Sequence, residues 1–265
     1  MIREAKIDDL DTVVELTKVN RARRARLHGD YWPPAKGADE MHATYLESIL
    51  RNTDIKALAL EKDGRVIGFA AVQRRPFFSF IDDICLADDA DWRADGVELL
   101  RGVEARPAIA TVAHGDPPLV DAALAIGLTL VSTHRLFRLG NFDPVDVESS
   151  DDVPTDLVEP PLHVFIPLME QQPKVVVKGD GEGYAVCSQS ITPPPILDIG
   201  GTTAVIDRVV GDDRRAILKS VLSFIQSRGD VSAILVVAAE DRELSRIADS
   251  LGASHPVDVL KWPEK

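Results

Sequence analysis

Cysteine is scarce in this chain, which has only Cys85 and Cys187 among its 265 residues. Both lie in short apolar runs that we expect to be strands, and no cluster of further metal ligands stands near either one in the sequence. Two isolated thiols exclude a disulfide scaffold and argue against a structural zinc site. We therefore expect two reduced core cysteines and no bound metal.

Long hydrophobic runs are also missing. No apolar stretch approaches the length of a membrane span, and the opening "MIREAKIDDLDTVVEL" has no secretory core. Basic residues are too few to balance the acids: residues 1–140 hold 19 Lys and Arg against 22 Asp and Glu, and the remainder holds 11 against 21. A net charge of −13 disfavours nucleic acid as a partner. We expect a cytoplasmic protein without nucleic-acid or membrane partners, and its oligomeric state stays open.

Two local clusters stand out from this acidic background. "NRARRARLHG" places Arg21, Arg23, Arg24 and Arg26 at the end of a predicted helix, where they either face solvent near the negative helix end or contact an anion or substrate. "HGDYWPPAKG" follows, and its Tyr31 and Trp32 precede two prolines in a stiff loop. These two rings are candidates for substrate binding, and the alternative is that they cover the core.

The chain divides around an acidic, proline-containing stretch. Residues 141–161, "NFDPVDVESSDDVPTDLVEPP", hold seven acids, four prolines and no basic residue. This composition is typical of a linker or of an ordered but exposed connection. We predict an N-terminal domain over 1–140, a linker over 141–163 and a C-terminal domain over 164–265.

The two halves repeat one pattern at a separation of 125 residues. "AIATVAHGDPPLVDAALAIGL" overlies "AILVVAAEDRELSRIADSLGA" without a gap, which pairs Gly127 with Gly252. At the same separation Asp82 pairs with Asp207. A strand and a helix that keep their order and spacing favour a duplication over two unrelated units.

Periodicity and turn residues predict the elements of each half. In the first half they are two helices over 8–27 and 39–52, a hairpin over 55–74 that turns at Asp63-Gly64, strands over 78–87, 108–113 and 129–140, and helices over about 96–104 and 117–126. In the second half they are a hairpin over 174–191 that turns near Asp180-Gly181, a strand over 202–210, a helix over 214–228, and a shortened opening helix near 162–172.

This order resembles that of the GNAT acetyltransferase superfamily. "IREAKIDDLDTVVEL" is similar to the first strand and helix of the family, "ALALEKDGRVIGFAAV" to its β-hairpin, and "SFIDDICLADDADWRADGVELL" to its motif A. The resemblance covers residues 1–140 and, less closely, 164–262. It implies an α/β fold with a mixed sheet, the acyl-CoA N-acyltransferase fold, in two tandem units of which the second is degenerate. It also implies acetyl-CoA as the cofactor.

Motif A carries the cofactor prediction. The resemblance implies a loop that offers main-chain N–H groups to the coenzyme A pyrophosphate, with contacts from Cys85, Leu86, Arg93, Gly96 and Val97. Arg93 and Gly96 fit the Arg-x-x-Gly part of the motif, but Glu98 stands where the family has a small residue. A carboxylate there would repel phosphate if it pointed inward. In the second half the loop has no glycine, although Arg214 and Arg215 are positive, and we predict a structural role for that copy.

Catalysis needs a base for the amine and a proton donor for the thiolate. The resemblance places a carboxylate on the strand before motif A, which implies Asp82 as the base and Asp83 as the alternative, because adjacent strand residues face opposite ways. Both aspartates could instead only solvate a sheet edge. The last helix has Ala123 and Ala248 where the family has a tyrosine.

Histidines add one further candidate. His114, which ends a predicted strand, is a weak candidate base, and the other histidines have no partner at a recognisable spacing.

We therefore predict an acetyl-CoA-dependent N-acyltransferase that transfers directly to a small amine or amino-acid-like acceptor. The alternative is a non-catalytic GNAT-like protein for binding or assembly. The acceptor, the acyl chain and the general acid are not defined by the sequence.

Overall fold

The computed structural model describes residues 1–74, 78–103, 107–151, 174–178 and 183–262. The chain separates into two compact units: Met1–Leu130 with Pro195–Asp198 and Asp258–Lys265, and Val131–Pro194 with Ile199–Val257. The sequence prediction instead ended the first domain at residue 140. No helix in the described residues is both long and apolar enough to cross a membrane.

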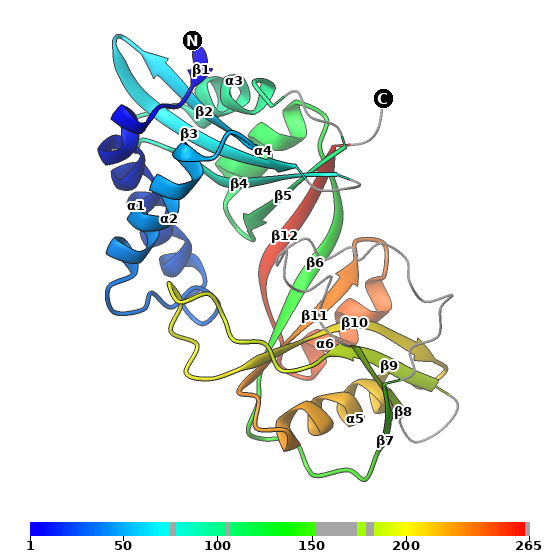
Figure 1. Ribbon diagram of the computed structural model, residues 1–265. Helices are drawn as coiled ribbons and strands as arrows, with labels where there is room; N and C mark the ends of the chain where they lie inside the picture. The colour runs from blue at the N-terminus through cyan, green and yellow to red at the C-terminus, as the bar shows by residue number, and fades with distance from the viewer. Residues whose placement is uncertain (75–77, 104–106, 152–173, 179–182, 263–265) are drawn as a thin grey trace. The chain divides into compact units, whose positions relative to one another are not determined.

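The first unit has its elements in the predicted order (Figure 1). They are β1 (Ile2–Glu4), a 3₁₀ turn (Ile7–Asp9), α1 (Leu10–Leu27), α2 (Ala38–Arg51), β2 (Ile55–Lys62), β3 (Arg65–Arg74), β4 (Ser79–Leu86), a π-helical turn (Trp92–Gly96), α3 (Val97–Arg101), β5 (Ala108–Ala113) and α4 (Pro117–Ala125). Strands β1 to β4 are antiparallel neighbours, and β4 pairs with β5 in parallel. Mixed pairing of this kind confirms the predicted α/β class with a mixed sheet.

Local sequence explains the turns of this unit. The β2–β3 hairpin turns at Asp63 and Gly64, with φ of +53° and +74°, as a two-residue hairpin turn with positive φ requires. The helix predicted over about 96–104 is shorter in the structure: α3 ends at Arg101 and follows a π-helical turn, and residues 104–106 lie outside the described part. Phe69, Leu46 and Leu60 are fully buried in the core of this unit.

The second unit repeats the hairpin–strand–helix–strand–helix–strand series (Figure 1). Its elements are β6 (Thr129–Arg138), β7 (Glu148–Ser150), β8 (Lys174–Lys178), β9 (Gly183–Ser188), β10 (Thr203–Gly211), α5 (Arg214–Ser227), β11 (Ser232–Ala238), α6 (Arg242–Ser250) and β12 (Ser254–Trp262), of which β6 begins and β12 ends in the first unit. The buried stripe of α5, with Leu218, Val221 and Ile225, packs against the sheet. The turn predicted at 180–181 and the helix predicted near 162–172 lie outside the described residues.

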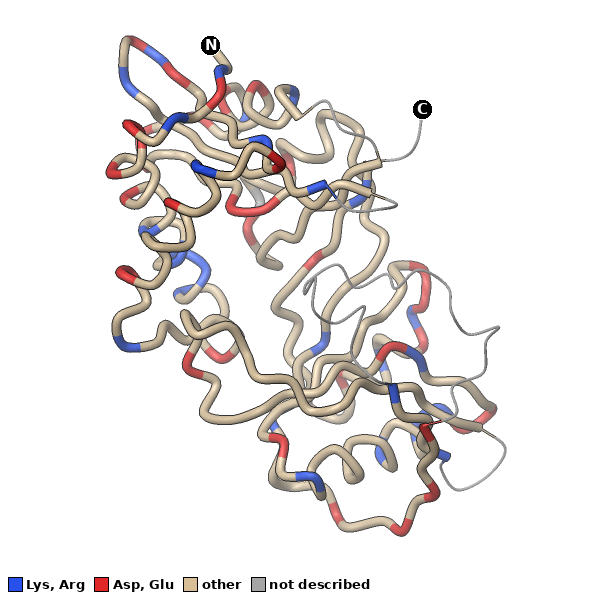
Figure 2. The backbone as a smooth tube through the Cα atoms, in the orientation of Figure 1, with Lys and Arg blue, Asp and Glu red and all other residues tan. Residues whose placement is uncertain are grey.

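The described part of the predicted linker, residues 141–151, is exposed and belongs to the second unit. It carries several acidic positions along its backbone (Figure 2). It also contains β7, which pairs with β8 in antiparallel fashion, so this portion is an ordered and exposed connection.

Helices α4 and α6 show the duplication most directly. Each begins after an aspartate, Asp116 or Asp241, and the two helices are offset by 125 residues at both ends. Two residues after the end of each helix stands a glycine with positive φ, +91° at Gly127 and +86° at Gly252. The same helix stop at the same offset agrees with two copies of one unit.

Replacing either of these glycines by alanine should destabilise the unit that contains it. An L-residue in the left-handed region costs about 1–2 kcal/mol, so Gly127→Ala and Gly252→Ala should each lower the free energy of unfolding by about that amount. Urea unfolding followed by circular dichroism measures the loss. The exposed Asp121→Ala on α4 is the control and should change stability by less than about 0.5 kcal/mol. Unchanged stability in both glycine variants would contradict the helix-stop role.

Candidate active site

The candidate site lies where strand β4 is bulged. Strand β3 pairs Ala71 with Asp82 and Phe69 with Cys85, so one extra residue is inserted in β4 between these pairs. Asp83 has a φ of +47°, and apart from Asp63 in the hairpin turn no other non-glycine residue in the described chain has positive φ. Such a conformation costs about 1–3 kcal/mol and persists only where the surroundings enforce it. The bulge therefore brings Asp82 and Asp83 into the same neighbourhood despite their adjacent positions.

Strands β4 and β5 separate at the same point. Their parallel pairing covers only Ser79–Ile81 and Ala108–Ala110, although both strands continue beyond it. On β4 past this point, the side chain of Asn20 donates a hydrogen bond to the carbonyl of Ile84 at 3.2 Å. The divergence leaves a strand edge that no longer pairs with β5.

Asp82 is held by two neutral donors. The Tyr45 hydroxyl donates to Asp82 Oδ2 at 3.0 Å, and Gln73 Nε2 donates to the same oxygen at 3.2 Å. Burial and the adjacent charge of Asp83 raise the pKa of Asp82 to about 6, which outweighs the opposing hydrogen bond from Tyr45. Burial and the nearby carboxylates also raise the pKa of Tyr45. Asp82 is therefore ionised near neutral pH but close enough to its pKa to accept a proton readily.

Asp83 has a cationic environment instead. His42 Nε2 lies 3.0 Å from Asp83 Oδ2, and Arg21 contacts both His42 Nδ1 and the Asp39 carboxylate. Arginine is only a donor, so Nδ1 of His42 accepts, and Nε2 carries the hydrogen that it donates to Asp83. Burial acts to raise the pKa of Asp83, but the hydrogen bond from His42, together with the charges of Arg24 and Arg21, outweighs burial and lowers the pKa.

The environments of the two aspartates thus drive their pKa values apart. Asp83 stays a carboxylate, and its charge helps to raise the pKa of Asp82. Such a divided pair is how proteins assign one carboxylate to structure or electrostatics and the other to proton transfer. The arrangement can take a proton from an ammonium group at neutral pH.

His42, Tyr45 and Gln73 are the residues of this group that sequence reasoning missed. His42 and Tyr45 are three residues apart on α2, and their rings stack with centroids 5.9 Å apart. Their partners lie 41 and 37 residues further along the chain, so no spacing signal connects them. The available signal was the place of His42 on the same buried helical stripe as Leu46 and Ile49.

The second unit has a bulge at the equivalent place but a different environment. The register between β9 and β10 shifts at Asp207, between Ile206 and Arg208. Lys174 Nζ forms an ion pair with Asp207 Oδ2 at 2.5 Å. Arg214 pairs with Asp241, and Asp213 caps α5 by accepting from Ala216 N. These pairings favour the predicted structural role of this copy.

The motif A loop is closed by its own acids. Asp91 accepts a hydrogen bond from Arg93 N at 2.9 Å, and Asp95 accepts one from Asp91 N at 3.0 Å. Asp95 is buried and pairs with Lys62 at 3.1 Å. The N–H of Arg93, which a pyrophosphate would need, is thus already bonded to a carboxylate.

Gly96 is a packing residue in the structure. It is buried, and a Cβ there would lie 2.8 Å from the Trp92 ring. Glu98 pairs with the amino group of Met1 at 3.1 Å, and the Arg93 side chain is exposed. The glycine of the motif therefore meets the Trp92 ring and does not present an open helix end.

The strand and helix residues predicted to contact the cofactor are mostly core residues. Cys85 is fully buried, burial raises the pKa of its thiol, and its sulfur faces the carbonyl of Phe69. Leu86 is buried, and Val97 packs against the core. The side chains of Cys85 and Leu86 are therefore closed to a cofactor, which could meet only the backbone of these two residues.

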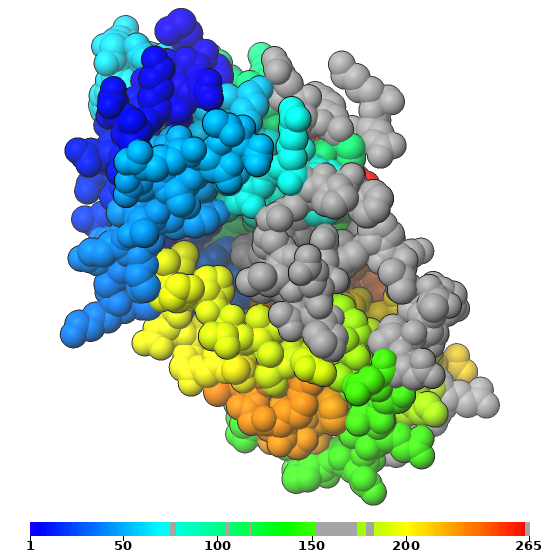
Figure 3. Space-filling model, viewed as in Figure 1, coloured from blue at the N-terminus to red at the C-terminus, as the bar shows by residue number. Residues whose placement is uncertain are grey.

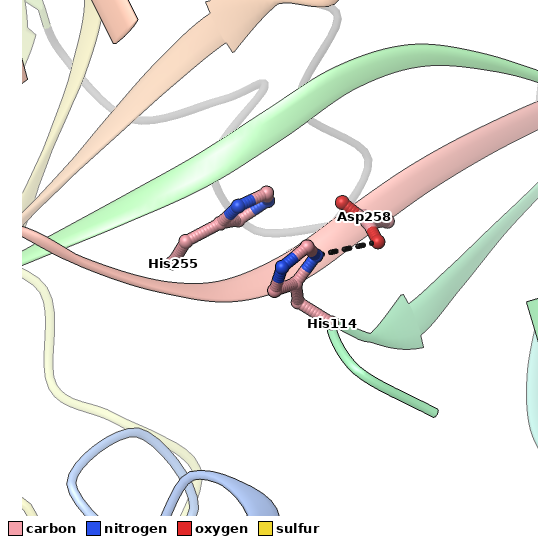
Figure 4. Close-up of side chains that lie close together, drawn as sticks. All are labelled: His114, His255 and Asp258. Carbon is pink, nitrogen blue, oxygen red and sulfur yellow. Dashed lines mark hydrogen bonds and ion pairs between the residues drawn. The ribbon is translucent and has the colours of Figure 1, made fainter. Parts of the chain in front are cut away.

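His114 does not join the aspartate pair through the contacts that the structure gives. Its Nδ1 lies 3.0 Å from Asp258 Oδ2, and its carbonyl accepts from His28 Nε2 at 2.7 Å. Figure 4 shows the His114–Asp258 bond, together with His255, which lies three residues before Asp258 on β12. A role for His114 as a base stays a prediction.

Tyr31 and Trp32 are both buried, with rings packed edge to face at 4.8 Å. Their loop is held by residues 195–198: Ala35 N donates to the carbonyl of Ile196, and Asp198 N donates to that of Pro33. In Figure 3 the yellow atoms of this segment lie against the blue atoms of the α1–α2 region. The burial favours the reading that the two rings cover the core, and substrate binding by them stays a prediction.

The arginines of α1 are largely engaged inside the unit. Arg23 pairs with Asp116 at 3.1 Å and lies over the Trp92 ring at 4.9 Å. Burial lowers the pKa of Arg23 and raises that of Asp116. With Arg21 bound to Asp39, the reading of this cluster as a solvated helix end is wrong for these two residues.

Known structures share this fold. The chain is similar to a GCN5-related N-acetyltransferase from Sphaerobacter thermophilus, with 15% identity, a TM-score of 0.52, and coverage of 99% of this chain and 95% of that one. It is also similar to a GCN5-related glucosamine N-acetyltransferase region of a fungal multi-domain GH3 β-N-acetylglucosaminidase, with 14% identity, a TM-score of 0.55, and coverage of 98% of this chain and 38% of that one. No family model and no curated protein matches the sequence. The chain has the GNAT acetyltransferase fold, as the sequence predicted.

The pH dependence of stability tests the environment of Asp82. Because its native pKa of about 6 exceeds the ordinary value of 3.8, Asp82 favours the native state most below about pH 4, and this contribution is lost as pH rises through about 6. The free energy of unfolding of Asp82→Asn minus that of the unsubstituted protein should therefore increase between pH 4 and pH 7. At about 1.4 kcal/mol per pKa unit, discounted for partial exposure, the increase should be about 1–2 kcal/mol.

Urea unfolding across this pH range measures that difference. The exposed Asp54→Asn serves as the matched charge control, and its difference should stay flat. A flat difference for Asp82→Asn as well would show that Asp82 has no raised pKa.

Proposed function

We propose that the protein is an acetyl-CoA-dependent N-acetyltransferase whose first unit is the working copy and whose acceptor is a small amine. The observation that carries this proposal is the bulged β4 strand, which places a carboxylate of raised pKa beside a strand edge that has separated from β5. The shared fold with known N-acetyltransferases supports the same reaction class. A cytoplasmic location and the absence of a metal remain parts of this proposal.

The first unit suits one part of coenzyme A, the amide-bearing arm, better than another, the pyrophosphate. Beyond Ile81 the edge of β4 no longer pairs with β5, and this suits an extended amide-bearing arm that bonds the strand backbone as an added strand would. The carbonyl of Ile84 is the exception, because it already accepts from Asn20. The motif A loop suits a pyrophosphate less well, because Asp91 and Asp95 occupy its N–H groups. We therefore expect cofactor binding that is weak and limited by the loop.

Acetyl-CoA, when bound, supplies an acetyl group as a reactive thioester. Asp82 accepts the proton that the acceptor ammonium must lose to become a nucleophilic amine. Tyr45 and Gln73 orient the accepting oxygen, and the ionised Asp83 keeps the pKa of Asp82 within reach of neutral pH. Ala123 is buried on α4, where the family resemblance places a tyrosine, so no side chain is assigned to protonate the thiolate.

Kinetics test the role of Asp82 in transfer. Loss of a general base costs about 10²–10⁴-fold, so Asp82→Asn should lower kcat/KM for an accepted amine by that range and remove the limb of the pH profile near 6. The thiol released from acetyl-CoA measures the rate. Asp207→Asn is the matched control from the second unit and should keep the rate of the unsubstituted protein. An equal loss of kcat/KM in both variants would contradict the proposal that the first unit is the working copy.

Coenzyme A binding tests the loop. Asp91→Asn keeps an acceptor for the Arg93 N–H but removes a charge, so it should tighten coenzyme A by about three- to tenfold. Arg93→Ala should weaken binding, and the exposed Asp54→Asn should leave it unchanged. Isothermal titration calorimetry measures all three.

The acidic loop also favours the second candidate, a GNAT-fold protein that binds partners without catalysis. Absence of coenzyme A binding in the unsubstituted protein and in Asp91→Asn would reject the acetyltransferase and leave this candidate.

A further inference from the structure

Arg24 differs from its neighbours on α1. Arg21 and Arg23 are bound to carboxylates, whereas Arg24 forms no ion pair among the residues that the structure describes. Its guanidinium lies 5.7 Å from the centroid of the Trp32 ring, and its side chain is half-buried. Such a cation is held in place by an aromatic face but keeps its hydrogen-bond donors available.

The helix face places Arg24 toward the aspartate pair. Asn20, one turn earlier on the same face of α1, donates to the carbonyl of Ile84 on β4. Arg21, one turn earlier on the adjoining face, reaches His42. Arg24 thus lies one turn after Asn20, which contacts the bulged strand, and one turn after Arg21, which contacts the His42 side chain bonded to Asp83.

Electrostatics agree with this placement. Burial acts most strongly on four nearby groups and favours a raised pKa in each: Asp82, Asp83, Cys85 and Tyr31. The charge of Arg24 acts in the opposite direction and favours a lower pKa in all four. Yet none of the four oxygens of Asp82 and Asp83 forms an ion pair with Arg24. The charge of Arg24 therefore acts on the two carboxylates without forming an ion pair with either one.

We propose that Arg24 binds the carboxylate of the acceptor, so that the acceptor is an amino acid whose ammonium group faces Asp82 and whose carboxylate faces Arg24. This inference rests on the proposed acetyltransferase function and specifies its substrate class. A zwitterion carries one charge that complements Asp82 and one that complements Arg24, whereas a simple amine leaves Arg24 unmatched. Two charge-assisted contacts with fixed spacing also select against acceptors that lack either group.

The test compares each amino acid with the amine that lacks only its carboxylate, such as leucine with 3-methylbutylamine, phenylalanine with phenethylamine and lysine with cadaverine. For the best pair, the unsubstituted protein should favour the amino acid. Arg24→Gln should raise KM for the amino acid by about 10- to 100-fold. It should change kcat and the kinetics of the amine far less, because burial, Asp83 and Tyr45 all act on the pKa of Asp82 more strongly than Arg24 does. Arg26→Gln, the exposed neighbour on the same helix, is the matched control and should behave like the unsubstituted protein.

Three results would overturn this inference. Equal use of amines and amino acids by the unsubstituted protein would reject the acceptor class but leave the proposed acetyltransferase function intact. An equal loss of rate for both members of a pair in Arg24→Gln, with a shifted pH profile, would mean that Arg24 only balances the charge of Asp82. If no acceptor is acetylated, the proposed function fails. Calorimetric titration of the same amino acids then tests the inference separately. No binding to the unsubstituted protein, or equal binding to Arg24→Gln, would reject it.

Discussion

The bulge in β4 is the constraint on which the candidate site depends. One extra residue between Asp82 and Cys85 puts Asp83 at a positive φ, ends the pairing with β5 and brings two carboxylates into one neighbourhood. The conformation is unfavourable by itself for a residue with a Cβ. It is stabilised by the bond from His42 to Asp83 and by that from the N–H of Asp83 to Asp82. The same two aspartates thus carry the negative charge of the site and make the hydrogen bonds that stabilise its strained backbone.

The second unit shows what this framework becomes when its carboxylate is neutralised. The bulge persists at Asp207, but Lys174 provides a direct counter-ion. Helix α5 runs without interruption from a capped start, whereas the first unit has a π-helical turn before the short α3. π-Helical turns are uncommon and are found mainly at functional sites. The two copies therefore share a backbone plan and differ in whether the bulged strand carries an unneutralised charge.

Most of the fold could be predicted from the sequence, because its signals are local. Glycines with positive φ stop α4 and α6, and the apolar runs of β5 and α5 match their predicted bounds closely. The site was predictable only in part. Asp82 and Asp83 could be placed on a strand, but their partners on α1 and α2 lie at separations that no pattern fixes. Gly96 was misread because the π-helical turn buries it under Trp92, which the Arg-x-x-Gly spacing does not reveal.

The proton affinity of Asp82 is set at a distance from Asp82 itself. Its direct partners, Tyr45 and Gln73, are neutral donors that favour the ionised form. Its raised pKa comes from burial and from Asp83, which stays charged because His42 holds it and Arg21 with Asp39 fixes the imidazole. A chain of contacts from the end of α1 through α2 therefore controls how readily Asp82 accepts a proton. Among the residues that the structure describes, α1 and α2 have no counterpart in the second unit, and it is their side chains that give the first unit a carboxylate with a pKa close to neutral pH.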